Sequence, residues 1–519
     1  MTLVHQMLAT TAARLPEKTA LVEGDRALSY AEVAAQVERL ACGLQTRGVT
    51  RGDRVALLFP NCLEFALSYY AALRLGAIAV PLNNRLAAGE LAYILNDSGA
   101  KLLLLGPGFG EEFLAFRDDL ETVEQVFLAG EETIPGVKPW DNLLQSPGAA
   151  GVEMDSGEPA CIMYTSGTTG LPKGAVMSHR NIMANARNCG AHLHYRESDV
   201  TLIAVPLFHV TGLNSQLVAF GYTGGCCVLM RRYGTAEMIR LVEQHRVSVL
   251  FNVPTMYTLM LQSYELTQRD LSPLRTAVYG GAPMPPETAR ALQSRLGVDL
   301  YNAYGLTETS SLATVLPSCD AVRKGASVGL PVSGVRLSVV DEHDNEVEAG
   351  SVGELVIEGA NVVSRYWNKP QATKAAIADG RLRTGDYARI DAEGFVYVVD
   401  RKKDMINRGG ENIYSIEVES VLVTHPQVLE AAVVPRAHSI FGEVVHAFIV
   451  PRPGGEVTEE EVIEHCRGRI ADFRMPCSIS LIENLPRNPG GKVLKNRLRE
   501  LVPEGDPPRR EPDTTRTKS

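Results

Sequence analysis

Short apolar runs alternate with longer amphipathic stretches along the first part of the chain. Residues 54–59 and 77–82 have the continuous apolar character of buried strands, and residues 61–75 between them carry apolar side chains at helical spacing. An apolar run at 101–105 continues this rhythm, and a second block of the same kind spans about 201–304. Repeated strand–helix–strand units predict a largely parallel sheet covered by helices, which is an α/β fold.

The pattern changes in the second part of the chain. Residues 336–399 contain short apolar runs separated by turn residues, which is typical of a small β-rich unit. From residue 400 onwards, helical and strand patterns return with their own apolar positions, which predicts a separate small domain. Residues 151–159 are polar and glycine-containing, as expected of a linker. Residues 503–519 have almost no apolar side chains and are predicted to be disordered.

Composition narrows the class of protein. The chain has 519 residues, 45% apolar and 22% charged, so it can form packed cores and is too long for a single one. The net charge of -10 argues against a nucleic-acid-binding protein, which would need a basic face. The chain contains no run of about 18 apolar residues, so no membrane span is predicted. Because the nine cysteines are odd in number and form no C-x-x-C, we expect reduced thiols and a cytoplasmic location.

One glycine-rich segment interrupts the strand and helix pattern. Residues 164–174 read YTSGTTGLPKG and combine three glycines, four serine and threonine hydroxyls and a lysine. Glycine allows close backbone approach to a ligand, and hydroxyl and ammonium donors suit phosphate. The segment is not a Walker A loop, because Pro172 stands where that loop needs its second glycine. We expect a phosphate-binding loop that includes Thr165, Ser166, Gly167, Thr168, Thr169 and Lys173.

The same segment resembles the phosphate loop of the adenylate-forming superfamily, which contains acyl-CoA synthetases, aryl-CoA ligases, beetle luciferases and peptide-synthetase adenylation domains. Six further segments resemble motifs of that superfamily and follow in the expected order. They are PLFHVTG at 206–212, GGAPM at 280–284, NAYGLTET at 302–309, RTGD at 383–386, DRKKDMINRGGENIYSIEVE at 400–419 and LPRNPGGKVLK at 485–495. On these motifs the chain is identified as an AMP-forming acyl-CoA synthetase of the fatty acid or aryl acid–CoA ligase type.

This resemblance implies a two-step reaction and a two-domain fold. ATP and a carboxylic acid, with Mg²⁺, give an acyl-adenylate and pyrophosphate, and the acyl group then passes to coenzyme A. The expected fold is a large N-terminal domain of layered α/β sheets with a β-rich subdomain, residues 1–402. A small mobile C-terminal α+β domain, residues 403–502, and the tail 503–519 follow. In relatives the small domain rotates between the two steps, and Lys403 matches their pivot.

The NAYGLTET motif supplies most of the expected nucleotide contacts. It ends an apolar run, so it should lie at the carboxyl edge of the sheet, where α/β proteins bind ligands. Glu308 offers a hard oxygen suited to Mg²⁺, and the resemblance gives it that role and gives Thr307 the α-phosphate. Tyr304 can stack on a purine beside a flat backbone edge. The other residues expected at this site are Gly280, Gly281, Ala282, Asn302 and Gly305.

Three charged residues in later motifs complete the expected adenylation site. Asp386 can accept two hydrogen bonds from ribose hydroxyls, and Arg401 resembles an arginine on the ribose side of the nucleotide. Lys492 matches the catalytic lysine of the superfamily. A cation that reaches both the carboxylate and an α-phosphate oxygen offsets the charge that develops during attack.

Coenzyme A contacts are expected from the resemblance alone. The segment with Gly409 and Gly410 would line the pantetheine tunnel, where glycine allows close backbone approach. Arg85, Phe441 and Phe473 lie where aryl-CoA ligases bind the nucleotide of coenzyme A. An arginine can pair with phosphate and an aromatic ring can stack on adenine.

The acyl pocket is expected near the PLFHVTG and NAYGLTET motifs. His209 matches a residue near the substrate carboxylate, although a structural core histidine is an alternative. No arginine occurs in these segments, which favours an apolar aliphatic or aromatic monoacid over a dicarboxylic acid. The predicted pocket residues are His209, Val210, Thr211, Asn214, Tyr279, Ala303 and Ser310.

Several alternatives remain open. The segment 102–112 resembles a dinucleotide-binding turn, but Gly110 is out of register with G-x-G-x-x-G, so a dehydrogenase is disfavoured. A peptide-synthetase domain would carry an aspartate near His209, and luciferase chemistry leaves no mark that the sequence can show. An acyl-adenylate ligase that loads a carrier protein instead of coenzyme A is the main alternative. The identity of the acid stays open. The oligomeric state also stays open, and a homodimer is one of the alternatives.

Overall fold

The computed structural model describes residues 2–144, 152–165, 171–487, 493–503 and 505–507. The chain divides into two compact units. Unit 1 comprises residues 1–337 and 356–383, and unit 2 comprises residues 338–355 and 384–519. Each unit has its own sheets and apolar core, so each is described by itself.

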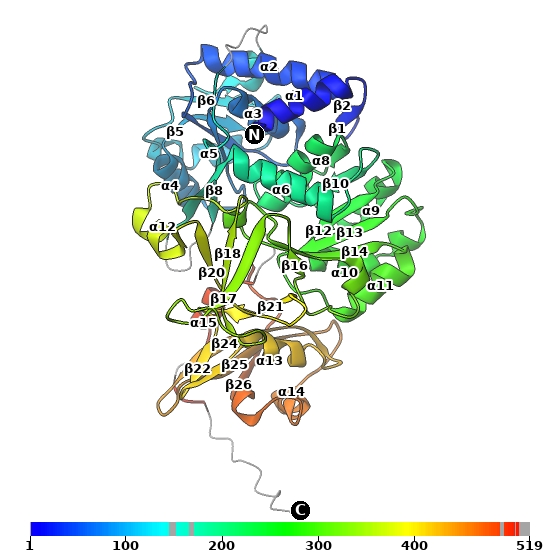
Figure 1. The fold of residues 1–519 in the computed structure, drawn as a ribbon, viewed down its shortest axis with the longest axis vertical. Helices are drawn as coiled ribbons and strands as arrows, with labels where there is room; N and C mark the ends of the chain where they lie inside the picture. Colours follow the sequence, from blue (N-terminus) through cyan, green and yellow to red (C-terminus); the bar gives the residue numbers. More distant parts are fainter. Residues whose placement is uncertain (1, 145–151, 166–170, 488–492, 504, 508–519) are drawn as a thin grey trace, which may run out of the picture. The chain divides into compact units, whose positions relative to one another are not determined.

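A seven-stranded sheet forms the first layer of unit 1 (Figure 1). Its inner strands pair in parallel, and only the last two strands form an antiparallel hairpin. Those inner strands are almost continuously buried, which explains their uninterrupted apolar runs. In spatial order the strands are β7 (Lys138–Pro139), β6 (Gln125–Leu128), β5 (Ala100–Leu105), β3 (Arg54–Leu58), β4 (Ile78–Pro81), β8 (Pro159–Thr165) and β9 (Lys173–Ser178).

A nine-stranded sheet forms the second layer of unit 1. It is parallel in its centre and antiparallel at both ends. In spatial order the strands are β16 (Leu330–Pro331), β15 (Thr314–Leu316), β14 (Asp299–Tyr304), β13 (Thr276–Gly280), β12 (Val249–Asn252), β10 (Val200–Ile203), β11 (Cys226–Leu229), β1 (Thr19–Glu23) and β2 (Arg26–Ser29).

The helices of unit 1 cover these sheets. A capping box of Ser178 and Asn181 starts the helix that follows β9. The helices are α1 (Val4–Arg14), α2 (Tyr30–Thr46), α3 (Leu63–Arg74), α4 (Ala88–Ser98), α5 (Gly110–Leu114), α6 (His179–His192), α7 (Val210–Gly212), α8 (Ala219–Thr223), α9 (Thr235–Gln244), α10 (Pro254–Gln262), α11 (Pro286–Leu296) and α12 (Pro370–Ala376).

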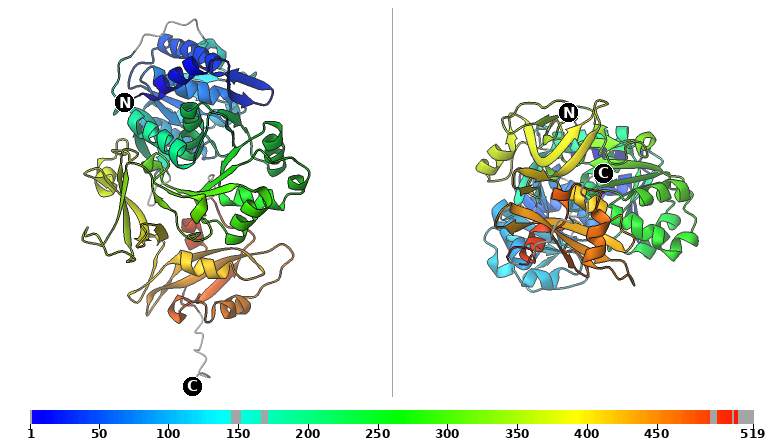
Figure 2. Two further views of the ribbon diagram at one scale, coloured as in Figure 1. Left: turned by 45° about the vertical axis from the view of Figure 1, so that its right-hand side comes forward. Right: turned by 90° about the horizontal axis from the view of Figure 1, so that it is seen from below.

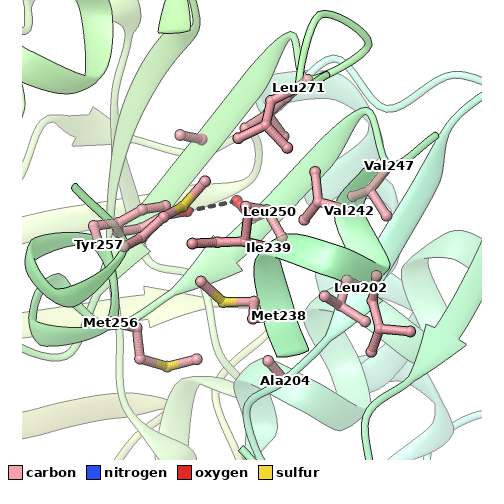
Figure 3. Packing of buried hydrophobic residues seen from close by; sticks show 14 of the residues in the cluster. Leu202, Ala204, Met238, Ile239, Val242, Val247, Leu250, Met256, Tyr257 and Leu271 are labelled. Atoms are coloured by element: carbon pink, nitrogen blue, oxygen red, sulfur yellow. Dashed lines mark hydrogen bonds between the residues drawn. The ribbon is translucent and has the colours of Figure 1, made fainter. Parts of the chain in front are cut away.

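The core beside the nine-stranded sheet shows how a polar group is tolerated inside it. Figure 3 shows Met238, Ile239 and Val242 of α9 packed with Leu202 of β10 and Leu250 of β12. In the same cluster the Tyr257 hydroxyl donates to the backbone oxygens of Leu250 and Val278, both at 2.9 Å. The buried hydroxyl therefore has its partners, and the cluster stays closed to water.

A third, five-stranded sheet corresponds to the β-rich stretch expected at residues 336–399. Its order is β17, β18, β20, β19, with β21 also pairing with β20. The boundary between the two compact units passes through three of its strands. The strands are β17 (Val335–Val340), β18 (Gly353–Gly359), β19 (Ile377–Ala378), β20 (Arg381–Ile390) and β21 (Val396–Arg401).

The sheet of the C-terminal part carries helices on both faces. Val433 and Ala447 pack with the residues of α13 and α14, whereas Val434 and Phe448 pack with Leu498 of α15. Because side chains alternate along a strand, these two sets lie on opposite faces. Figure 2 shows this sheet from two further directions. The elements are β22 (Ile406–Arg408), β23 (Glu411–Ile413), α13 (Ser415–Leu422), β24 (Val428–His438), β25 (Gly442–Pro451), α14 (Glu459–Cys466), β26 (Ser478–Leu481) and α15 (Lys495–Glu500).

Two residues of the tail that we expect to be disordered make contacts in unit 2. The backbone oxygen of Gly505 accepts hydrogen bonds from the Arg436 guanidinium at 2.9 and 3.1 Å, and Asp506 accepts one from the backbone N–H of Ser439 at 2.8 Å. Residues 504 and 508–519 of the tail lie outside the described residues.

Candidate active site

The nucleotide motif lies at the carboxyl edge of the nine-stranded sheet, as expected. Strand β13 ends at Gly280 and the neighbouring β14 ends at Tyr304, with Gly280 paired to Ala303. A side chain at Gly280 would put its Cβ 2.4 Å from the Ala303 oxygen, so only glycine fits there. Gly281 has a φ of +80° and open space where a Cβ would lie. Both glycines lie at this strand edge, and their place beside the purine stays a prediction.

The turn after Tyr304 is strained and tightly held. Residues Thr307–Thr309 form the short helix η5, and the next two residues, Ser310 and Ser311, have φ values of 55° and 122°. Non-glycine residues rarely adopt these angles, and such strain persists only where the surroundings enforce it. Gly305 permits the close return of the chain, because a Cβ there would lie 1.4 Å from the Ser311 oxygen.

Neutral side chains of two helical segments hold this turn. The Asn214 amide donates to the Ser310 oxygen at 3.0 Å, and the Ser215 hydroxyl donates to the Ser311 hydroxyl at 2.7 Å. Asn185 of α6 accepts from the backbone N–H of Leu312 at 2.9 Å. The turn that carries Glu308 is therefore fixed to the helices beside it.

Glu308 lies beside a residue that the motifs did not indicate. The Tyr366 hydroxyl donates to Glu308 Oε1 at 2.7 Å. The Lys173 ammonium lies 5.8 Å from the centroid of the same ring. Burial raises the pKa of the Tyr366 phenol well above its ordinary value, and the Glu308 carboxylate raises it further, so the phenol remains a donor. The structure thus brings the expected metal ligand and the lysine of the glycine-rich loop around one phenol.

The ends of the glycine-rich loop are anchored, although its centre is not described. Thr165 and Lys173 face each other across the β8–β9 hairpin. The Tyr164 hydroxyl donates to Asp97 at 2.7 Å, and the Lys369 ammonium pairs with the same carboxylate at 2.6 Å. The loop residues expected to bind phosphate, Ser166, Gly167, Thr168 and Thr169, and the expected catalytic Lys492 lie outside the described residues.

The segment expected to line the acyl pocket forms an irregular helix. His209 precedes α7, and residues Leu213–Val218 continue as the π-helix η3 before α8. Such wide turns are rare in proteins, and many of those that occur lie at functional sites. Burial lowers the pKa of His209 to about 4, and the positive charge of Arg85 contributes, so the imidazole is neutral near physiological pH. Arg85 is exposed, and its guanidinium therefore lies close enough to His209 to lower the pKa of the imidazole.

Buried polar atoms gather where this helix meets the nucleotide turn. Among the described residues, Asn214 Oδ1, Ser310 Oγ and His209 Nε2 are buried and have no hydrogen-bond partner. Such atoms are costly unless a ligand or water satisfies them. Ala303 and Tyr279 are buried on adjacent strands, whereas Val210 and Thr211 are half-buried.

One expected nucleotide residue also has a structural partner. The Asn302 side chain is buried and donates to the Ser327 oxygen at 3.1 Å. Its amide nitrogen therefore supports the loop after β15, and its contact with the nucleotide stays a prediction.

The expected ribose residues form an ion pair within unit 2. Asp386 on β20 and Arg401 at the end of β21 are cross-strand partners. Arg401 Nε lies 2.6 Å from Asp386 Oδ1, and the Asp386 side chain is only 3% exposed. The two side chains are positioned together by the sheet register, so a ligand that binds one of them is near the other.

The expected pivot residue lies between two anchored neighbours. The Lys402 ammonium pairs with Glu354 at 3.1 Å, whereas Asp404 pairs with Arg499 of α15 at 2.6 Å. Arg499 also donates to the backbone oxygen of Lys403 at 2.9 Å. Burial lowers the pKa of the Lys403 ammonium, although Asp404 acts in the opposite direction.

Of the residues expected to contact coenzyme A, Arg85 belongs to unit 1, and the other four fall into two places in unit 2. Gly409 has a φ of 60° and donates to the Phe441 oxygen at 2.9 Å, and Gly410 has a φ of 97° with open space around it. Phe441 is exposed, with the Arg408 guanidinium 4.3 Å from its centroid. Phe473 packs against the core beneath α13 and α14.

The described residues fit an ATP–Mg²⁺ complex better than a protein-held metal. They contain no group of three or more His, Cys, Asp or Glu side chains that could hold a metal ion. Glu308 would provide a single carboxylate, which suits Mg²⁺ because this ion is usually held by one or two carboxylates, water and phosphate oxygens.

In the part of the chain that the structure describes, no helix is long and apolar enough to cross a bilayer.

Sequence reasoning missed Tyr366, Asp97, Ser215 and Arg499. Tyr366 and Glu308 are 58 residues apart, and Arg499 and Asp404 are 95 apart. Neither pair forms a local pattern, so a single sequence carries no signal for these contacts.

Comparisons with known proteins agree with this geometry. A model of the AMP-binding enzyme family matches residues 8–367, and a model of its C-terminal domain matches residues 417–492. An indoleacetate–CoA ligase of Aromatoleum aromaticum is 38% identical over 94% of this chain and 96% of its own. A long-chain-fatty-acid–CoA ligase of Mycobacterium tuberculosis is 36% identical over 95% and 97%. A fatty acid–acyl-carrier-protein ligase of Streptomyces coeruleorubidus is 34% identical over 92% of each.

Solved structures show the same fold over nearly the whole chain. An anthranilate CoA ligase in complex with anthranoyl-AMP matches with a TM-score of 0.91, at 27% identity over 96% of this chain and 97% of its own. An o-succinylbenzoate CoA synthetase from Bacillus subtilis in complex with ATP and magnesium matches with a TM-score of 0.85, at 32% identity over 95% and 98%. The chain therefore belongs to the AMP-binding enzyme family and is an AMP-forming ligase of the acid–CoA type, with ATP, Mg²⁺ and coenzyme A as its cofactors.

Proposed function

We propose that this enzyme activates an apolar aliphatic or aromatic monoacid and transfers the acyl group to coenzyme A. In the first step a substrate carboxylate oxygen bonds to the α-phosphorus, and the bond from that phosphorus to the bridging oxygen breaks to release pyrophosphate. In the second step the thiol, on losing its proton, bonds through sulfur to the acyl carbon, and AMP leaves.

The observation that carries the acid class is the set of groups near the predicted acyl pocket. His209 is neutral, and it offers a buried polar atom together with the unpartnered Asn214 Oδ1 and Ser310 Oγ. The predicted pocket residues include no buried cation. The cation close to this set is Arg85, which is exposed. A second carboxylate would be buried without a counter-ion, at a cost of several kcal/mol. A monoacid avoids that cost.

The roles of individual residues follow the motifs. We propose that Glu308 holds the Mg²⁺ of ATP, Thr307 contacts the α-phosphate, and Tyr304 with Gly280–Ala282 receives the base. The loop from Thr165 to Lys173 would bind the phosphates, and the Asp386–Arg401 pair would bind the ribose. Lys492 would stabilise the charge that develops during adenylation.

Domain rotation is part of the same proposal. Lys403 lies between Lys402, anchored to Glu354, and Asp404, anchored to Arg499, so its backbone is a natural point for a change of dihedral angles. The residues after it, 403–502, would then turn to present Gly409 and Gly410 to pantetheine. Arg85, Phe441 and Phe473 remain proposed contacts of the coenzyme A nucleotide. A cytoplasmic location is proposed because all nine cysteines are free thiols.

The alternative acceptor is a carrier protein. Among the relatives, the Streptomyces coeruleorubidus enzyme is a fatty acid–acyl-carrier-protein ligase at 34% identity, so this acceptor merits a direct test. The exposed ring of Phe441 beside Gly409 favours coenzyme A, since a nucleotide base can stack there.

The testing experiment measures AMP formation with ATP and Mg²⁺ across short, medium and long aliphatic, aromatic, polycyclic and dicarboxylic acids. Each acid is assayed alone, with coenzyme A and with a phosphopantetheinylated carrier protein. AMP release that depends on coenzyme A with one class of monoacid is expected. Preferential activation of dicarboxylic acids would contradict the acid class, and release that needs the carrier protein would contradict the acceptor.

A further inference from the structure

A short segment that the motifs do not include is joined to the strand leaving the glycine-rich loop. The backbone N–H of Val176 donates to the Arg365 oxygen at 3.1 Å, and the N–H of Trp367 donates to the Gly174 oxygen at 2.7 Å. Tyr366 forms an antiparallel bridge with Ala175 between these two bonds. Residues 365–367 therefore continue the pairing of β9, whose first residue is Lys173.

The same stretch of chain also forms hydrogen bonds with Glu308. The Tyr366 hydroxyl donates to Glu308 Oε1 at 2.7 Å, and the backbone N–H of Val363 donates to the Glu308 backbone oxygen at 2.9 Å. The Tyr366 residue is 8% exposed. Glu308 is thus held at its main chain and at one carboxylate oxygen by residues only three apart.

The far end of the segment is also fixed. Lys369 pairs with Asp97 at 2.6 Å, and the Asn368 amide donates to the Asp97 backbone oxygen at 3.2 Å. Asp97 accepts in turn from Tyr164, the residue before Thr165. Because the segment is bonded to β9, to η5 and to α4, the phenol has little freedom to move relative to Glu308.

We propose that Tyr366 is a positioning residue: its hydroxyl holds Glu308 Oε1 so that the other carboxylate oxygen is presented to the Mg²⁺ of ATP. This inference rests on the proposed role of Glu308 as the metal ligand. It adds that the orientation of Glu308 is set by the strand that leaves the phosphate loop. A carboxylate in a fixed rotamer binds without first losing that freedom, which strengthens metal binding.

A phenol suits this task better than other donors of similar reach. A lysine or arginine in its place would neutralise the carboxylate and compete with the metal for it. A neutral hydroxyl fixes one oxygen and leaves the negative charge available. Tyr366→Phe keeps the ring, its packing and its contact with Lys173, and removes only the donor.

The first test is equilibrium binding of ATP to the full-length protein by calorimetry, in excess Mg²⁺ and separately in EDTA. Tyr366→Phe should weaken binding about tenfold with Mg²⁺ and leave binding in EDTA unchanged, since a hydrogen bond to a charged group is removed. The Mg²⁺ concentration for half-maximal adenylation should rise by a similar factor, with recovery at high Mg²⁺. Equal binding loss in both conditions, or no loss, would overturn the proposal.

A matched control and a double variant separate this proposal from the function on which it rests. Tyr257→Phe also removes a buried, bonded hydroxyl from unit 1, and it should lower the melting temperature without changing the Mg²⁺ requirement. If Glu308→Gln keeps its Mg²⁺ dependence, the role of Glu308 fails. If Glu308→Gln loses that dependence but Tyr366→Phe has the same effect in both backgrounds, the coupling fails and Tyr366 acts elsewhere.

Discussion

The surroundings of Glu308 in unit 1 and of Lys403 in unit 2 are held by different kinds of bond. Around Glu308 the donors are neutral: the Tyr366 hydroxyl, the Asn214 amide and the Ser215 hydroxyl. Around Lys403 the partners form ion pairs: Arg401 with Asp386, Lys402 with Glu354, Arg499 with Asp404, and Lys495 with Glu419.

The difference matches what each region has to do. Hydrogen bonds from neutral donors are directional and depend less on salt than ion pairs do, so they suit a turn that holds Ser310 and Ser311 at strained angles. Ion pairs attract over longer distances and tolerate changes of angle, so they suit the rotation that we propose for the segment after Lys403.

The largest effect is expected from Lys492→Ala. Given the proposed role of Lys492 at the α-phosphate, loss of its cation should slow formation of the acyl-adenylate by about 10³-fold. Thioester formation from supplied acyl-adenylate should be largely retained, because the proposed role is confined to the first step. The two half-reactions are measured separately, by pyrophosphate release and by acyl-CoA formation. Loss of both, with an unchanged melting temperature, would contradict this division of roles.

Lys495→Met should cause the largest loss of stability in the Lys403 region. The Lys495 ammonium pairs with Glu419 at 2.7 Å and bonds Ser415, which in turn bonds Asp400. Removing a largely buried partner leaves carboxylates without their cation, at a cost of about 3 kcal/mol in the free energy of unfolding. Urea titration of the full-length protein measures this loss. Arg497→Met on the exposed face of α15 is the matched control and should cost little.

The loss in Lys495→Met should also depend on pH. Burial raises the pKa of Glu419 and of Asp400, and Lys495 opposes this in both. A carboxyl group whose folded pKa is raised is stabilising below its unfolded pKa, and that stability is lost as pH rises. Without Lys495 the rise in pKa is larger, so the stability deficit should widen from about pH 5 to about pH 7. A deficit that shrinks over this range would contradict the assigned charges.

A smaller effect is expected from two neutral histidines, His5 of α1 and His179 of α6. Burial lowers the pKa of His5 and of His179 to about 4, and Arg74 and His5 respectively lower them further. A histidine with a lowered folded pKa is stabilising above its unfolded pKa near 6.5 and loses that stability as pH falls towards 4. His5→Phe should therefore reduce the loss of stability between pH 7 and pH 5 by about 1–2 kcal/mol, measured by urea titration. An unchanged acid sensitivity would show that His5 is protonated in the folded state.

The smallest effect is expected from Arg499→Ala. The pair with Asp404 is partly exposed, so its loss should cost about 1 kcal/mol and should vanish as salt rises from about 0.1 to about 1 M. Tyr366→Phe is the comparison variant, because a neutral donor should give a salt-independent effect on stability. Equal salt dependence of the two variants would remove the contrast between the regions.

The sequence predicts the strands and the nucleotide edge well, because both rest on local patterns. The apolar run at 54–59 is β3, the run at 77–82 is β4, and NAYGLTET begins on β14 and continues just beyond its carboxyl end at Tyr304. The family resemblance is confirmed by the family models and the relatives. The roles of individual residues stay predictions.

Other features could not be predicted, and for physical reasons. The contact of Tyr366 with Glu308 depends on how β9 and η5 pack, which is a long-range outcome of the fold. The π-helix at Leu213–Val218 follows from packing too, because nothing in LNSQLV distinguishes it from an α-helix. The partners of Asn302 and Arg499 have the same origin.

The π-helix between α7 and α8 has a consequence for how specificity could change over evolution. A π turn holds an extra residue compared with an α turn, so deleting one residue from Leu213–Val218 would convert it to the regular form. The elements on either side could then keep the faces that they bury, while the side chains within the segment would take new positions. Asn214 would leave Ser310, and the predicted acyl pocket would be lined differently with no substitution at all. A single-codon deletion is therefore a short route from one acid to another.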